Sequence, residues 1–160
     1  FPIPLHWTWY EAIDPHGARP SCIIFATVDP EGYVYIVDQA VVDGSAPEIF
    51  QVCQEIRAKH GGRTPVWTVV DKKAATQRNK VGGKETSWEK ELRQSGFNKL
   101  VFSDSSPGSV GAGVRILKEY LKPEYNHLFQ ENIPRLRFFK TLHQLHKKTD
   151  GVLSMVSGFK

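Results

Sequence analysis

The 160-residue sequence has few cysteines and no long apolar run, and these two absences exclude several classes of protein. Its two cysteines, Cys22 and Cys53, are too few for a disulfide-stabilised scaffold or a zinc site with four thiolate ligands. No stretch approaches the roughly 20 consecutive apolar residues of a membrane-spanning helix, and no signal peptide is evident. We therefore expect a soluble, reduced, intracellular protein. Because the chain begins with Phe1 rather than Met, we also expect residues 1–160 to form one domain of a longer polypeptide.

Several nucleotide-binding and catalytic motifs are missing as well. A phosphate-binding loop ending at Lys84 would need a glycine at the position of Arg78. The glycines of residues 108–113 have the reverse of the spacing found in dinucleotide-binding loops. His143 and His146 have no nearby cysteine or carboxylate to complete a zinc site, and no serine-hydrolase signature occurs. The sequence thus favours neither a nucleotide cofactor nor zinc chemistry.

Negative charge is scarce in the second half of the chain. Residues 1–70 contain 4 Lys or Arg and 8 Asp or Glu, whereas residues 71–160 contain 17 and 9. A basic half in a protein with a pI near 9.1 indicates a polyanionic partner, most simply nucleic acid.

The pattern of apolar residues predicts an α/β fold. A short apolar stretch runs from Trp7 to Pro15. Residues 22–28 and 33–37 follow; they are rich in β-branched and aromatic side chains and flank a turn at residues 29–32. Three antiparallel strands are therefore expected to open the domain. Further strands are predicted at residues 65–70, 100–102 and 135–139, and helices after Ser45, after Thr86, at 110–121 and at 152–159, with a loop from Lys72 to Glu85. Strands followed by alternating helices and strands imply a mixed sheet flanked by helices.

Three aspartates occupy positions where elements begin or end: Asp14, Asp71 and Asp150. Ligands of open α/β sheets gather at strand ends, where carboxylates can converge on Mg²⁺ or Mn²⁺. Turn or cap formation is the alternative for each of them. Asp71 is the least ordinary, because the residues after it are predicted to be a loop rather than a helix that it would cap. Turn or strand-end roles are expected for Asp29, Asp38, Asp43 and Asp104.

Taken in order, these segments resemble the C-terminal nuclease domain of the large terminase subunit, the DNA-packaging motor of tailed bacteriophages. The resemblance extends over nearly the whole chain, and the segments that carry it are Ala12–His16, Val28–Gln39, Val69–Asp71, Leu92–Phe97, Gly111–Leu121 and Pro134–Phe139. It implies a ribonuclease H-like fold and a metal-dependent endonuclease for double-stranded DNA. It also implies an ATPase domain, a portal and a small terminase subunit as partners, and the host cytoplasm as the place of action.

The resemblance further implies that Asp14, Asp71 and Asp150 are the catalytic residues and bind two Mg²⁺ or Mn²⁺ ions. In that arrangement Asp14 would bridge both ions, Asp71 would bind one and Asp150 the other. The family usually has a second aspartate four residues beyond the last of these, and here that position is Ser154.

A basic segment directly after Asp71 is our candidate for contacting DNA. Five cations fall within 13 residues without an intervening acid: Lys72, Lys73, Arg78, Lys80 and Lys84. Such residues bind the phosphate backbone without reading sequence. A solvated loop is the alternative for this segment. For the whole chain the alternatives are a ribonuclease H-like resolvase or transposase-type nuclease and a non-catalytic nucleic-acid-binding domain.

Overall fold

The computed structural model describes residues 2–81, 84–127, 129–139 and 142 of the chain. Its elements, in chain order, are β1 (Thr8–Asp14), β2 (Ser21–Val28), β3 (Val34–Val42), α1 (Ala46–Lys59), β4 (Trp67–Val70), α2 (Lys72–Thr76), β5 (Arg78–Val81), β6 (Lys84–Ser87), α3 (Trp88–Ser95), β7 (Leu100–Phe102), α4 (Ser109–Leu121), β8 (Pro123–Asn126), β9 (Glu131–Pro134) and β10 (Leu136–Phe138). Within these residues, no helix combines the length and the apolar character needed to cross a bilayer.

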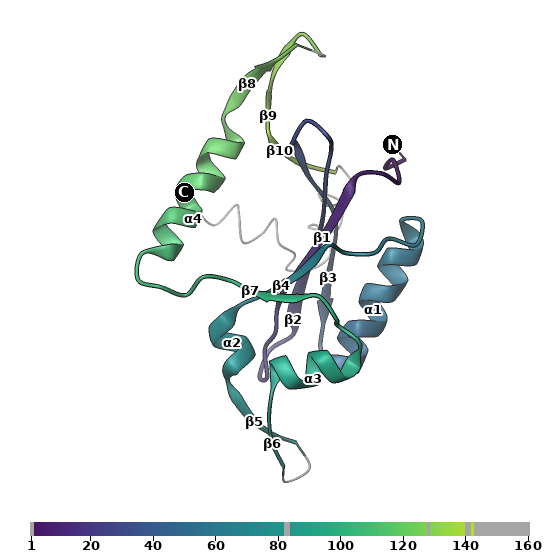
Figure 1. Cartoon of the computed structure of the whole chain (residues 1–160), viewed down its shortest axis with the longest axis vertical. Coiled ribbons are helices and arrows are strands. Elements are labelled where there is room, and N and C mark those ends of the chain that lie inside the picture. Colours follow the sequence, from purple (N-terminus) through teal and green to yellow (C-terminus); the bar gives the residue numbers. More distant parts are fainter. Residues whose placement is uncertain (1, 82–83, 128, 140–141, 143–160) are drawn as a thin grey trace.

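Six strands form the central sheet, in the order β10-β3-β2-β1-β4-β7 (Figure 1). β1, β2 and β3 pair antiparallel, whereas β4 is parallel to β1, β7 to β4, and β10 to β3. This is the mixed sheet expected from the sequence, with three antiparallel strands first and parallel strands after them. β10 is the expected edge strand. The remaining strands form two separate hairpins, β5–β6 and β8–β9.

Local signals in the sequence account for several element boundaries. In the β2–β3 turn, the Asp29 carboxylate accepts the backbone N–H of Glu31, and Gly32 adopts a φ of 85°. Ser45 and Glu48 form the capping box of α1, in which the Ser45 N–H donates to Glu48 Oε2 at 2.6 Å. These features confirm the predicted hairpin and helix start.

The core lies between the sheet and the two helices α1 and α3. Alternate residues of β1 and β2 face these helices, as a strand's period of two requires. The fully buried apolar side chains include Ile23, Phe25, Ile49, Cys53 and Leu92. One charged residue lies among them, because Glu11 of β1 is only 1% exposed.

The Glu11 carboxylate is neutralised and fully hydrogen-bonded inside this core. Arg57 of α1 donates Nε–H to Oε1 and Nη2–H to Oε2, each at 2.7 Å. Trp9 Nε1–H and the Thr68 hydroxyl donate to the same carboxylate at 3.2 Å. A buried carboxylate without a cation would cost several kcal/mol, so this bidentate pair fixes α1 against the sheet. Since Thr68 belongs to β4, the same network also joins β1 to β4.

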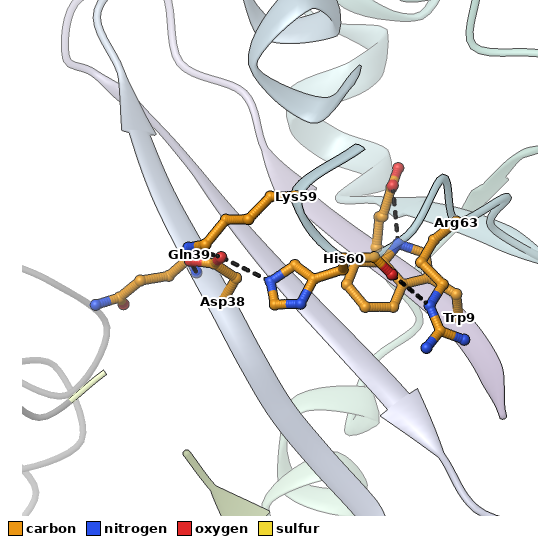
Figure 2. Close-up of polar contacts among 7 residues, drawn as sticks. Trp9, Asp38, Gln39, Lys59, His60 and Arg63 are labelled. Atoms are coloured by element: carbon orange, nitrogen blue, oxygen red, sulfur yellow. Dashed lines mark hydrogen bonds and ion pairs between the residues drawn. The ribbon is translucent and has the colours of Figure 1, made fainter. Parts of the chain in front are cut away.

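A second carboxylate, Asp38, faces α1 from within β3, and its side chain is 8% exposed. Lys59 Nζ donates to Asp38 Oδ2 at 2.7 Å, and the His60 ring lies 2.9 Å from the same oxygen (Figure 2). The expected turn or strand-end role of Asp38 is therefore wrong: it is a mid-strand residue that binds the C-terminal end of α1. Nearby, the buried Arg63 donates to the carbonyl oxygens of Ile3 and His60, which ties the segment before β1 to the end of α1.

Other expectations need correction. The region after Asp71, predicted as a loop, contains α2 and the β5–β6 hairpin. The helix expected after Thr86 begins one residue later, with Ser87 as its N-cap. The β8–β9 hairpin was not predicted. α4 is a helix as expected, but it has no buried residue, and Val110 is 79% exposed. The helix predicted at 152–159 lies outside the described residues.

The Asp38 contacts predict a pH-dependent contribution to stability. Burial opposes ionisation, but hydrogen bonds from Lys59 and His60 outweigh it, so the pKa of Asp38 lies below its ordinary value. The pair therefore stabilises the fold above the unfolded-state pKa of about 4, and this contribution is lost as pH falls through the folded-state pKa. We expect Asp38→Asn to lower the free energy of unfolding by about 2 kcal/mol at pH 7. Urea unfolding should show this difference shrinking below about pH 4; a constant difference would contradict the assignment.

Candidate active site

The parallel pairing of β1 with β4 brings two of the expected acidic residues to one edge of the sheet. The last residues paired between the two strands are Ile13 and Val70. Asp14, the last residue of β1, follows Ile13, and Asp71 follows the end of β4. Neighbouring strands lie about 4.8 Å apart, so the two aspartates leave the sheet side by side at its carboxyl edge. These residues are 57 positions apart in the sequence, and only this strand order makes them neighbours.

Asp71 is held in place by backbone and side-chain donors. It is the N-cap of α2, and its Oδ1 accepts the Ala74 N–H at 2.8 Å. The Ser103 hydroxyl, one residue beyond β7, donates to Asp71 Oδ2 at 3.3 Å. The expectation that no helix follows Asp71 is therefore wrong, and the residue does serve as a cap. Each carboxylate oxygen has two lone pairs, so these contacts leave acceptor capacity on both oxygens.

Asp14 lies at the exposed end of β1, opposite Cys22 of β2. In the described part of the chain, no hydrogen bond or ion pair engages the Asp14 carboxylate. Burial and then the Asp14 charge raise the pKa of the Cys22 thiol, while Arg19 lowers it. Asp14 and Arg19 therefore both lie close enough to Cys22 to act on it electrostatically. A raised pKa makes Cys22 a poor nucleophile.

The two carboxylates fit a hard divalent cation. Mg²⁺ and Mn²⁺ prefer carboxylate oxygens, and in proteins they are often bound through only one or two carboxylates. Among the described residues, no group of three or more His, Cys, Asp or Glu side chains is placed to bind a metal ion. Asp150, the third expected ligand, lies outside those residues. The structure therefore brings together two members of the expected triad.

The basic residues after Asp71 are placed next to this edge. Lys72 and Lys73 form the first turn of α2, and Arg78 begins β5. Lys80 lies in β5 and Lys84 in β6, the hairpin that extends past the end of the sheet in Figure 1. All five predicted DNA-binding residues thus belong to one continuous segment that begins at the candidate site.

Sequence reasoning missed one polar residue at this edge. Ser103 contacts Asp71, and no motif marks it; only its position after the strand next to β4 suggests a role. Asp104 accepts the N–H and hydroxyl of Ser106, and these contacts lower its pKa, with a smaller effect from Lys72. Its expected role as a turn residue is consistent with these contacts.

Comparison with solved structures identifies the fold. The nuclease domain of the P22 large terminase matches with a TM-score of 0.61 and 17% identity, over 96% of this chain and 80% of that one. The large terminase of a thermophilic bacteriophage matches in one crystal form with a TM-score of 0.56 and 14% identity, over 91% of this chain and 32% of that one. A second crystal form of the same terminase matches with the same TM-score and 13% identity. A scan of protein-family models and a search of curated proteins find no match.

These likenesses confirm the resemblance drawn from the sequence at the level of fold. The chain has the mixed α/β, ribonuclease H-like architecture of large-terminase nuclease domains. It spans about a third of the length of the thermophilic phage terminase that it matches.

Two substitutions of Asp71 separate its role as the N-cap of α2 from its expected role as a metal ligand. Asp71→Ala removes the acceptor for Ala74 and should destabilise the metal-free protein by about 1 kcal/mol. That corresponds to a fall of about 2–4 °C in Tm for a chain of this size. Asp71→Asn retains an N-cap oxygen and should leave Tm unchanged or slightly higher, because its repulsion with Asp14 is relieved. Equal losses of Tm in both variants would contradict the capping role.

Proposed function

We propose that this chain is a divalent-metal-dependent nuclease that cuts double-stranded viral DNA during genome packaging. The observation that supports it most strongly is the meeting of Asp14 and Asp71 at neighbouring strand ends, in a chain with the fold of large-terminase nuclease domains. Neither carboxylate is neutralised by an ion pair in the described residues. Uncompensated acids held side by side are typical of a cation site.

Asp14, Asp71 and Asp150 are the residues proposed to bind Mg²⁺ or Mn²⁺. When bound, a pair of such ions supplies an activated water and neutralises the charge that develops on the phosphate. The protein's contribution is to hold its ligands rigidly. β1 carries Asp14 on a fully paired strand, and the Ala74 N–H and Ser103 hydroxyl orient the Asp71 carboxylate. Fixed ligands avoid the reorganisation that mobile side chains would require.

The segment of Lys72, Lys73, Arg78, Lys80 and Lys84 is proposed to bind the DNA backbone beside the metal ligands. Contacts to phosphates position a duplex without reading its sequence, which suits an enzyme that must cut packaged DNA at many sites. In a longer polypeptide, an ATPase domain, the portal and the small terminase subunit would be its partners, in the host cytoplasm.

Plasmid cleavage tests the assignment of the acidic residues. The 160-residue chain should nick and linearise supercoiled plasmid with Mn²⁺ or Mg²⁺, and EDTA should stop the reaction. Asp14→Asn and Asp71→Asn should each reduce the rate more than about 100-fold, the upper range for residues that only support a ligand. Glu131→Gln, which removes an exposed charge in β9, is the matched control and should cut like the wild type.

Wild-type cleavage by either aspartate variant would contradict the site. Cleavage of branched but not linear duplex would instead favour a resolvase-like nuclease. Tight DNA binding with no cleavage in Mn²⁺ would favour a non-catalytic binding domain.

Salt dependence tests the proposed DNA path. Removing one cation that binds a phosphate should flatten the plot of log affinity against log salt concentration by about 0.9. Arg78→Ala with Lys80→Ala should therefore weaken binding to all duplex sequences alike and flatten this plot. Arg115→Ala with Lys118→Ala, on the exposed α4, is the matched double variant and should have the wild-type slope. The reverse result would move the DNA path to the basic residues of α4 and the segment after it.

A further inference from the structure

Ser103 lies at the carboxyl end of a third strand, beside the candidate site. β7 pairs in parallel with β4, and the last paired residues of the two strands are Phe102 and Val70. Ser103 and Asp71 follow them directly. The Ser103 backbone N–H donates to the carbonyl oxygen of Val70 at 2.9 Å, which continues the ladder past the last paired residues. The backbone therefore holds Ser103 next to Asp71.

The contacts of the Ser103 hydroxyl determine where its proton lies. Its oxygen is 3.3 Å from the backbone nitrogen of Lys72 and 3.3 Å from Asp71 Oδ2. A backbone N–H can only donate, so Ser103 Oγ accepts from Lys72 through a lone pair. An ionised carboxylate can only accept, so the hydroxyl donates its proton to Asp71 Oδ2. Both contacts of the hydroxyl are thus satisfied by one orientation of its proton.

Two donors from different elements therefore hold the Asp71 carboxylate. The Ala74 N–H of α2 binds Oδ1 at 2.8 Å, and the Ser103 hydroxyl beyond β7 binds Oδ2. The torsion that turns a carboxylate plane is soft, so a donor at one oxygen alone leaves the group free to turn. Donors at both oxygens restrict that rotation, and each oxygen retains a lone pair for a further ligand.

The Ser103 contact contributes little to folding, unlike the cap formed with Ala74. At 3.3 Å it is longer than the usual O–H···O distance of about 2.7–2.8 Å, so it is a weak hydrogen bond in the metal-free protein. The contact with the Lys72 N–H is exposed, and water can replace the hydroxyl there. Loss of this hydroxyl should therefore change the orientation of Asp71 more than the stability of the fold.

We propose that Ser103 is a positioning residue that raises the affinity of the site for a divalent cation by orienting the Asp71 carboxylate, an inference that rests on the nuclease function proposed above. Ser103 acts through Asp71 and has no need to contact the ion. Without the hydroxyl, the ligand remains but its carboxylate must be ordered when the ion binds, which lowers the affinity.

Calorimetric titration of Mn²⁺ into the 160-residue chain, without DNA, tests this role. Ser103→Ala should weaken Mn²⁺ binding about 10-fold or more, as the loss of partners of metal ligands typically does. The Tm of the metal-free variant should equal that of the wild type. Ser103→Thr keeps a hydroxyl at the same position and should restore the affinity. Ser106→Ala is the matched control, because its hydroxyl binds Asp104 instead, and it should bind Mn²⁺ like the wild type.

Three results would overturn the positioning role. They are wild-type Mn²⁺ affinity in Ser103→Ala, a loss that Ser103→Thr does not restore, and a loss accompanied by an equal fall in the Tm of the metal-free protein. Asp71→Asn distinguishes these from failure of the proposed function. Weak Mn²⁺ binding by Asp71→Asn with wild-type binding by Ser103→Ala would leave the nuclease function intact. Wild-type binding by Asp71→Asn would contradict both the metal site and the role of Ser103.

Discussion

The parallel pairing of β1 with β4 is the constraint on which the candidate site depends. β1 is an interior strand of the sheet, with antiparallel β2 on one side and parallel β4 on the other. Glu11 reinforces this position, because its carboxylate receives donors from β1, from β4 and from Arg57 of α1. A slip of one residue would separate Glu11 from Thr68 and Asp14 from Asp71 together. The same register between β1 and β4 therefore determines both the hydrogen bonds of the buried Glu11 and the position of Asp14 beside Asp71.

Acidic side chains in this molecule fall into two groups that differ in how they are compensated. Glu11 and Asp38 face α1, are almost fully buried, and are paired with cations of that helix. Asp14 and Asp71 lie at the carboxyl edge and have hydrogen-bond donors at most, as far as the described residues extend. The first group secures the fold, and the second leaves negative charge uncompensated at one place. Two lysines, Lys72 and Lys73, follow directly on the β4 side, in the first turn of α2.

The sequence predicted the parts of the fold that local chemistry determines. β-Branched runs around the Asp29 turn predicted β2 and β3, and the Ser45 capping box predicted α1. Prediction failed for short polar segments whose structure depends on contacts with neighbouring residues. α2 has only five residues and is capped by Asp71, and the β5–β6 hairpin has little apolar periodicity. Residue type and position at strand ends identified Asp14 and Asp71, but their adjacency required the strand order. Ser103 belongs to no motif, and only its three-dimensional contact with Asp71 reveals it.

We propose that Asp14 and Asp71 bind the same metal ion. Calorimetric titration of Mn²⁺ into the wild type, Asp14→Asn, Asp71→Asn and the double variant measures this directly. If the ion is shared, each single substitution weakens Mn²⁺ binding about 10-fold or more. The double variant should then bind little more weakly than either single variant, because either substitution alone already prevents the two carboxylates from binding the ion together. Independent losses that add in the double variant, or wild-type affinity in either single variant, would contradict the shared site.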